Sequence, residues 1–310
     1  MARKTWAAGD KVLADDINEN FNLSINFGGD GSDGALNVTT GTTNIDVAGA
    51  NIVVKQYTTI NIANGATLSI SNPASTGTIL IIKVQVTTTI AGKIDLKGKG
   101  ASQSTNPFTR QFFDNVSTTG GTAFSLANLY DLNLIYFLKR YNIFCGAGGT
   151  GTTSGASYSI GGSGGGGLYM EVNGDVDFAA TGIIDVSGTN AGVVYLGPGQ
   201  TSCGGGGGGA VGSALITYNG NLTNSGTATQ AGGNGAAGDY SYIGGDIAGG
   251  SGAGSYGAGG TAASGGAGGD GSDGSGGGGG GLNYPDGEKR AGGTGATTTK
   301  AIKFIANTLY

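Results

Sequence analysis

The sequence lacks several residue types that catalysis and metal binding usually need. Its 310 residues include no histidine, 2 cysteines and 4 prolines, and only 11% of them are charged. Without histidine a Ser-His-Asp or Cys-His catalytic arrangement is impossible, and two thiolates alone do not complete the ligand set of a zinc ion. We therefore predict a protein that is not an enzyme and has no cofactor.

Further absences restrict its partners and location. No run of about 18 apolar residues exists, so no membrane span is predicted, and the opening MARKTWAAGD lacks the apolar core of a secretory signal. The net charge is -5 and no Lys/Arg cluster is interleaved with aromatic residues, so nucleic acid is not an expected partner. Large apolar residues are too few for a thick core throughout, and we expect backbone pairing and assembly with copies of itself to add stability.

Glycine is the residue that the sequence has in excess, with 69 copies. Its blocks at 164–167, 204–209 and 276–281 alternate with aliphatic runs and carry almost no charge. A flexible linker, the alternative interpretation, would not normally show this alternation, and collagen would need a strict glycine period with abundant proline. We expect extended polyglycine helices with three residues per turn, packed side by side where any Cβ would clash.

Short runs rich in Ile, Val and Thr, bounded by Gly, Asn or Pro, predict β-strands. These runs are 44–47, 52–57, 59–62, 66–70, 78–86, 168–172, 183–186 and 214–218. A last strand is expected around Ile302, Phe304 and Ile305, where it would return to the β core and hold the glycine-rich region at both ends.

An internal repeat links these strands to the glycine blocks. The units 92–98, 182–188 and 226–232 each begin and end with glycine, follow an aliphatic run and precede glycine-rich sequence. This order predicts rungs of a solenoid-like or layered β structure with insertions. Asp95 and Asp185 occupy equivalent positions in the repeat; a carboxylate pair on adjacent rungs could hydrolyse a glycosidic bond, but a role in turns or ladders is favoured.

Two weaker site candidates come from short motifs. Asp30 and Asp33 lie in a Gly-Asp-Gly-Ser-Asp-Gly string that returns with Asp270 and Asp273, which makes all four weak calcium candidates. Their spacing does not match an EF-hand, so plain Asx-type turns are favoured.

The two cysteines, Cys145 and Cys203, each stand just before a glycine block. These matching contexts make a disulfide between them possible, with buried free thiols as the favoured alternative.

The chain divides into five expected regions: an attachment segment (1–27), a β domain (28–105), an aromatic-rich insertion (106–145), a glycine-rich domain (146–296) and a closing strand (297–310). Within the first, Leu13, Ile17 and Phe21 recur every four residues on one face of a short helix that must dock on a neighbour. The aromatic insertion, with a helix or strand over 125–141, is interpreted as local core or subunit contact, with a recognition surface as the alternative.

The N-terminal residues Trp6-Ala-Ala-Gly-Asp, with Leu13, Ile17 and Phe21 after them, resemble the start of many tailed-bacteriophage tail-fibre and receptor-binding proteins. The polyglycine blocks are similar to those of the tail-fibre tip adhesins of T-even-like phages, in which polyglycine helices present variable loops to the host. The resemblance implies a virion protein, assembled in the host cytoplasm and extracellular when mature. It also implies that Trp6, Leu13, Ile17 and Phe21 join the protein to a tail or baseplate protein. Because this chain has its own β region, a fibre, spike or decoration protein is as compatible as a detachable tip.

Tyrosines within or beside the glycine region are the candidate receptor contacts, because their rings can stack on sugars; packing is an equally weighted alternative. They are Tyr158, Tyr169, Tyr195, Tyr218, Tyr240, Tyr242, Tyr256 and Tyr284, of which Tyr240, Tyr242, Tyr256 and Tyr284 are the chosen candidates. We predict a mainly β virion adhesin, a homotrimer, that binds a host surface glycan or outer-membrane protein through loops between glycine helices. The alternative is a self-assembling structural filament or decoration protein without its own ligand.

Overall fold

The computed structural model describes five continuous stretches of the chain, 27–102, 160–192, 205–229, 231–234 and 302–306. It also describes the single positions Ile143, Cys145, Gly146, Gly148 and Gly149, and the backbone of a few two-residue strands. Every regular element in these residues is a β-strand, which confirms the mainly β prediction. The helices expected over 13–21 and 125–141 lie outside the described residues.

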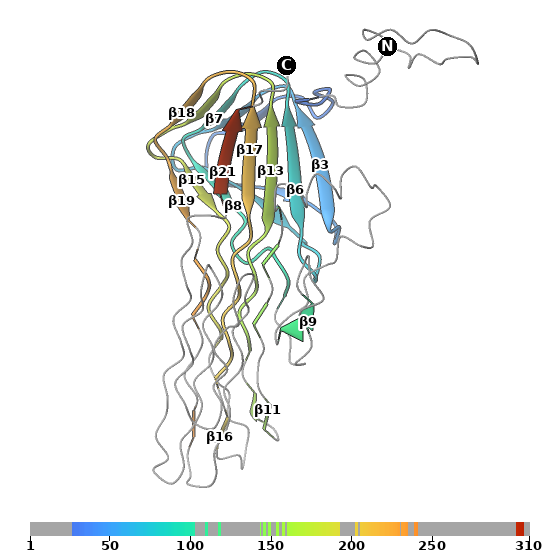
Figure 1. Ribbon diagram of the computed structural model, residues 1–310, viewed down its shortest axis with the longest axis vertical. Helices are drawn as coiled ribbons and strands as arrows, with labels where there is room; N and C mark the ends of the chain where they lie inside the picture. The colour runs from blue at the N-terminus through green and yellow to red at the C-terminus, as the bar shows by residue number, and fades with distance from the viewer. Residues whose placement is uncertain are drawn as a thin grey trace, which may run out of the picture.

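Three parallel sheets, named here A, B and C, form the body of the protein (Figure 1). Sheet A consists of β1 (Leu36–Val38), β4 (Ile60–Ile62), β7 (Thr88–Ile90), β14 (Val176–Phe178) and β18 (Leu222–Asn224). Sheet B consists of β2 (Thr42–Asp46), β5 (Thr67–Ser71), β8 (Lys93–Asp95), β15 (Ile183–Asp185) and β19 (Thr227–Thr229). Sheet C consists of β3 (Ile52–Tyr57), β6 (Ile79–Val84), β13 (Gly167–Val172), β17 (Ala214–Tyr218) and β21 (Ile302–Ala306).

The chain visits sheets A, B and C in turn, and each visit adds a strand beside the one from the previous visit. Five such turns build a three-sided β-solenoid with five rungs. In sheet C, for example, Leu168 of β13 lies between Leu80 of β6 and Ala214 of β17. The final strand β21 pairs with β17, so the predicted return of the C-terminal strand to the β core is confirmed. The ranges 28–105 and 146–296, separated in the sequence analysis, therefore share sheets.

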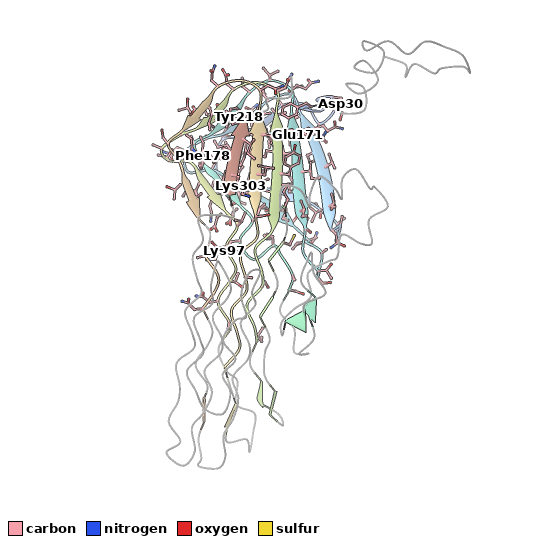
Figure 2. The ribbon with its side chains drawn as sticks, viewed as in Figure 1. Asp30, Lys97, Glu171, Phe178, Tyr218 and Lys303 are labelled. Atoms are coloured by element: carbon pink, nitrogen blue, oxygen red, sulfur yellow. The ribbon has the colours of Figure 1, made fainter. Side chains whose placement is uncertain are left out.

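The solenoid interior is filled by alternate residues of the strands. In β6, Leu80, Ile82 and Val84 belong to the central apolar cluster, whereas Ile79 and Ile81 point to the opposite face of sheet C. Phe178 (Figure 2) is among the largest fully buried side chains. Its ring stacks on that of Phe304 with centroids 5.7 Å apart. A continuous aliphatic core of this kind explains why Ile-rich and Val-rich runs dominate the strands.

The predicted repeat coincides with the corner between sheets A and B and the strand of sheet B that follows. Gly92, Gly182 and Gly226 each stand just before a sheet B strand. A Cβ at Gly182 or Gly226 would contact the Phe178 ring, and one at Gly92 would meet the carbonyl oxygens of the preceding rung. Glycine recurs here because backbone and ring approach too closely for a side chain.

The connections from sheet B to sheet C differ sharply in length. They are short in the first two rungs, at 47–51 and 72–78, and long in the last three, at 96–166, 186–213 and 230–301. Six two-residue strands in antiparallel pairs belong to the long connections. These are β9 (Thr109–Arg110) with β10 (Ser117–Thr118), β11 (Thr153–Ser154) with β12 (Ser157–Tyr158), and β16 (Ser202–Cys203) with β20 (Asp239–Tyr240).

One core position offers a test of the packing. Thr88 in β7 is 1% exposed, and its Oγ1 has no hydrogen-bond partner in the described structure. It lies between Ile60 and Val176 in the register of sheet A. A buried hydroxyl without a partner is destabilising, so Thr88→Val should raise the free energy of unfolding by about 1 kcal/mol. Chemical denaturation measures this, with Thr89→Val on the outer face as the control; a less stable Thr88→Val protein would contradict the assignment.

Candidate functional site: the glycine bundle

The described parts of the three long connections begin at the same corner of the solenoid, between sheets B and C, and are joined to one another by backbone hydrogen bonds. Their described glycine-rich parts are named here the glycine bundle: segments 97–102, 160–166, 186–192 and 205–213, with the shorter pieces 145–146, 148–149 and 231–234. Lys97 marks the point where the first of these segments leaves sheet B (Figure 2). The bundle is therefore formed by the connections of the last three consecutive rungs, which pack together as one extended structure.

Backbone hydrogen bonds in the bundle recur every three residues. Gly162 and Gly165 donate to the carbonyls of Gly207 and Ala210, at 2.8 and 2.9 Å. The same three-residue spacing holds between the other neighbouring segments, whose donor and acceptor pairs follow. They are Gly209 to Thr189 and Gly212 to Val186; Thr189 to Ser163 and Gly192 to Ile160; Gly149 to Gly162 and Gly146 to Gly165; and Gly188 to Ala231 and Ala191 to Asn234. A β ladder would repeat every two residues, whereas a three-residue period belongs to extended helices of the polyproline II type.

Segment 160–166 lies at the centre of this network. It exchanges backbone hydrogen bonds with the segments around residues 96–101, 146–149, 189–192 and 207–210. A strand in a sheet has at most two hydrogen-bonded neighbours, one on each edge. Because segment 160–166 has four hydrogen-bonded neighbours, the segments of the bundle pack in three dimensions and do not form a sheet.

Many glycines of the bundle have no room for a side chain. A Cβ at Gly165 would meet the carbonyl oxygen of Val186, one at Gly162 that of Thr189, and one at Gly209 that of Ser163. In each case the neighbouring atom is backbone, which cannot rotate away. Close Cα to carbonyl approaches of this kind supply weak Cα–H···O contacts in addition to the N–H bonds.

The candidate receptor tyrosines fall in different places. Tyr240 belongs to β20, which pairs with β16 far along the bundle from the sheets (Figure 1). Tyr242, Tyr256 and Tyr284 lie outside the described residues. Tyr169 and Tyr218, by contrast, are strand residues of sheet C, the first 3% exposed and the second packed against the core, so these two serve packing.

Cys145 sits at the base of the bundle as a buried free thiol. A Cβ at Gly77 would come within 2.9 Å of its side chain, which places it beside the connection into β6. Burial raises the pKa of the Cys145 thiol to about 12, and a backbone hydrogen bond from Gly167 only partly opposes this. The free thiol is the alternative that the sequence favoured over a disulfide; the side chain of Cys203 lies outside the described residues.

Asp95 and Asp185 are direct neighbours in sheet B, as their repeat positions suggested. Lys93 bridges them, with its Nζ 3.2 Å from Asp95 Oδ2 and 2.9 Å from Asp185 Oδ2. Each carboxylate also accepts a hydrogen bond from the backbone N–H two residues later, at Lys97 and Ser187. Both residues therefore make ladder and turn contacts.

The ion pair between Lys93 and Asp185 shifts the pKa values of both side chains. Burial raises the pKa of the Asp185 carboxyl, but hydrogen bonds from Lys93 and Ser187 outweigh it and leave the pKa below its ordinary value of 3.8. Burial lowers the pKa of the Lys93 ammonium, but its hydrogen bonds to Asp185 and Asp95 outweigh burial and leave the pKa above 10.5. The charged Asp185 therefore stabilises the fold at pH values above 3.8, and the charged Lys93 does so at pH values below 10.5.

An acid titration tests this assignment. Asp185→Asn should be less stable than the wild type at neutral pH, because the carboxylate contribution is fully present there. The difference in melting temperature should shrink as the pH falls below 3.8, where the wild-type carboxylate takes up its proton. A difference that stays constant from neutral to acid pH would contradict the lowered pKa.

Asp30 and Asp33 belong to the loop 27–34, which precedes the first rung. Asp30 Oδ1 accepts a hydrogen bond from the Ser32 N–H at 2.9 Å, which is the predicted Asx turn, and hydrogen bonds with Ser32 hold the Asp30 pKa below its ordinary value. Asp33 pairs with Lys55 at 3.2 Å and accepts the Gln56 N–H at 2.7 Å. No group of three metal-ligating side chains occurs in the described stretches, and Asp270 and Asp273 lie beyond them.

The loop 27–34 and the glycine bundle lie at opposite ends of the sheet C strands. The loop contacts residues at or just beyond the ends of β6 and β13, since a Cβ at Gly28 would come within 2.6 Å of Val84 O and 2.7 Å of Asn173 Cβ. The bundle enters the same strands at their beginnings, through Gly166 and Ser213. The attachment candidates Trp6, Leu13, Ile17 and Phe21 precede the described residues.

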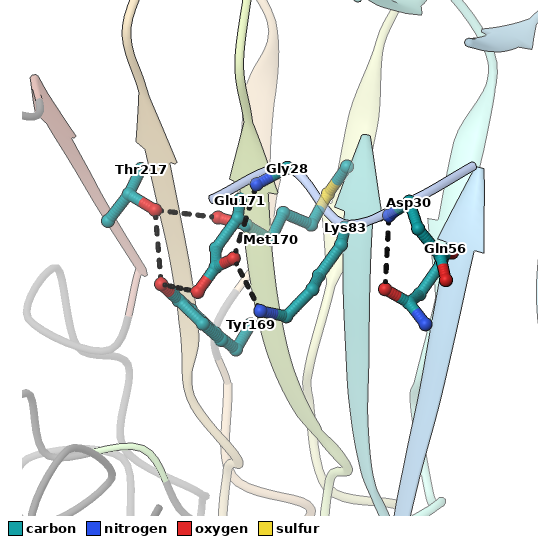
Figure 3. Close-up of polar contacts among 8 residues, drawn as sticks. All are labelled: Gly28, Asp30, Gln56, Lys83, Tyr169, Met170, Glu171 and Thr217. Atoms are coloured by element: carbon teal, nitrogen blue, oxygen red, sulfur yellow. Dashed lines mark hydrogen bonds and ion pairs between the residues drawn. The ribbon is translucent and has the colours of Figure 1, made fainter. Parts of the chain in front are cut away.

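The structure also brings together polar residues that the sequence reasoning did not select. One polar network on the outer face of sheet C joins Glu171, Lys83, Tyr169 and Thr217 (Figure 3). The one signal for it was a glutamate within the aliphatic run 168–172. A charged residue in such a run indicates a buried polar contact.

Among the described residues there is no helix of the length and apolar character that crossing a membrane requires. No family model, no curated protein and no solved structure matches this chain.

Proposed function

We propose that the protein is a virion adhesin that attaches to its particle through the N-terminal segment and binds the host surface through loops at the far end of the glycine bundle. The observation that carries this proposal is the placement of loop 27–34 and the bundle at opposite ends of the sheet C strands. An adhesin needs such separation, because the end that binds the particle must not compete with the end that binds the host. The resemblance of the N-terminal residues to tail-fibre proteins points the same way.

We also propose that the bundle segments are polyglycine helices with three residues per turn. Three features support this: hydrogen bonds at three-residue spacing, four neighbours around segment 160–166, and carbonyl oxygens where a Cβ would lie. Such a bundle needs no large apolar residues, because backbone hydrogen bonds in several directions hold it. It is a stiff stalk that keeps recognition loops away from the solenoid.

A competition experiment tests the adhesin role. The purified full-length protein should bind host cells and reduce adsorption of the particle. A variant with Tyr240→Ala and Tyr242→Ala should compete less well, whereas Thr223→Ala on the exposed face of sheet A should compete like the wild type. Folded protein that neither binds host cells nor protects them would overturn the proposal. Loss of host polysaccharide in the same assay would instead indicate an enzyme.

One observation favours the alternative of a structural filament. In the described sheets the last strands β18, β19 and β21 each have one neighbouring strand, so their other edges face no described strand and are candidate pairing edges. Stacking of copies on these edges would lengthen the solenoid. Sedimentation over a range of concentrations separates the two: growing assemblies favour the filament, and one fixed species favours the adhesin. A fixed species of three copies would support the predicted homotrimer; the three-sided solenoid itself closes within one chain.

A further inference from the structure

The loop 27–34 is built to lie on sheet C in one conformation. Gly28, Gly29, Gly31 and Gly34 all have positive φ angles, between 70° and 80°. A Cβ at Gly29 would come within 2.8 Å of Gln56 and Lys83, and one at Gly31 within 2.7 Å of Thr58. Only glycine combines these angles with such close contact.

Hydrogen bonds then join the loop to several strands. The Asp33 N–H donates to Gln56 O at 2.8 Å. Figure 3 shows two further bonds, from the Asp30 N–H to Gln56 Oε1 at 3.2 Å and from the Gly28 N–H to Glu171 Oε2 at 3.4 Å. Gln56 belongs to β3 and Glu171 to β13. The loop therefore spans three neighbouring strands of sheet C, with β6 between the other two.

Glu171 is the centre of this attachment. It is 7% exposed, and its carboxylate accepts hydrogen bonds from Tyr169 Oη at 2.8 Å and pairs with Lys83 Nζ at 2.9 Å. Tyr169 Oη in turn lies 3.3 Å from Thr217 Oγ1. The pair is only partly buried, because the Lys83 side chain is 23% exposed. Ion pairs shielded from water contribute little net stability compared with well-packed apolar residues, and their best-established use is to select one arrangement among several. The Glu171 oxygen that pairs with Lys83, Oε2, is the same atom that accepts the Gly28 N–H.

We propose that loop 27–34, held on sheet C by Glu171, is a rigid joint that fixes how the N-terminal attachment segment meets the solenoid. This role rests on the proposed function, since it gives the joint its purpose. A load applied at the N-terminus passes through the loop into β3, β6 and β13 together, because the loop contacts all three strands. The bundle at the other end of these strands is then held in a constant direction relative to the particle.

Hydrogen exchange on the purified full-length protein tests the joint without any particle or host. Glu171→Gln keeps the shape of the side chain but removes its charge, and the Lys83 ion pair with it. The amides of residues 28–34 should then exchange about tenfold faster or more, because local opening becomes easier, while β6 and β13 keep their protection. Asp177→Asn on β14 of sheet A likewise converts a carboxylate to an amide, but outside the network, and should leave exchange in the loop unchanged.

A second variant covers the case in which Glu171→Gln fails to fold. Gly29→Ala disturbs the loop at a position with φ of 73° and leaves Glu171 in place, and it should give the same local acceleration. Unchanged exchange at 28–34 in both variants, or equal acceleration throughout sheet C, would overturn the joint. Failure of the host-cell competition with the joint intact would instead overturn the proposed function alone.

Discussion

Gly165→Ala should lower the free energy of unfolding by about 1–3 kcal/mol, a large effect for the addition of one methyl group. The new Cβ would meet the carbonyl oxygen of Val186 and would lie 2.7 Å from the Gly212 backbone nitrogen. Both atoms are backbone, so relief requires the segments to move apart. Such movement would break the hydrogen bonds that Gly165 exchanges with Ala210 and Gly146.

The control for this prediction is Gly192→Ala in a neighbouring segment. A Cβ there would lie 3.4 Å from Ile160 Cβ, which is ordinary contact, so its effect should stay within about 0.5 kcal/mol. Chemical denaturation measures both variants, and hydrogen exchange shows where Gly165→Ala opens the structure. We expect faster exchange in 160–166 and 205–213 with the sheets protected. Equal effects of the two substitutions would contradict close packing in the bundle.

Phe178→Ala should cause a larger loss, about 3–5 kcal/mol. The Phe178 ring is 1% exposed and stacks on Phe304 of the last strand. Gly182 and Gly226, which pack against the ring, have no side chains that could collapse into the space left behind. The cavity would therefore remain, and the last rung would lose a contact that holds β21.

Phe178→Leu is the matched control, because it keeps most of the apolar volume and should destabilise the protein by less than half as much. Urea denaturation followed by circular dichroism measures both variants. Exchange in β21 should rise in Phe178→Ala before exchange in β6 does, since β21 loses its stacking partner. A loss below about 1 kcal/mol for Phe178→Ala would show that the corner can close around a smaller residue.

Much of the fold could be predicted from local patterns. The expected strands 52–57 and 214–218 coincide with β3 and β17, because aliphatic runs end at glycine or polar turn residues in both cases. The glycines at 92, 182 and 226 indicated a recurring close approach, which the structure places at the corner before sheet B. The site was harder to predict from the sequence. The sequence patterns pointed to tyrosines and aspartates, whereas Glu171 and Lys83 meet only because strands 88 positions apart pair with each other.

The sequence by itself determined the β character of the protein, the glycine composition that admits only close backbone packing or disorder, and the absence of histidine chemistry. These follow from local rules: alternation along a strand has a period of two residues, and each glycine's freedom depends on its own backbone. Only the tertiary structure decided that strands distant in sequence form three parallel sheets, that all three long connections leave one corner, and that loop 27–34 lies at the other end of sheet C. Pairing between distant strands depends on loop closure and on the sum of many contacts, and neither is visible in a local pattern.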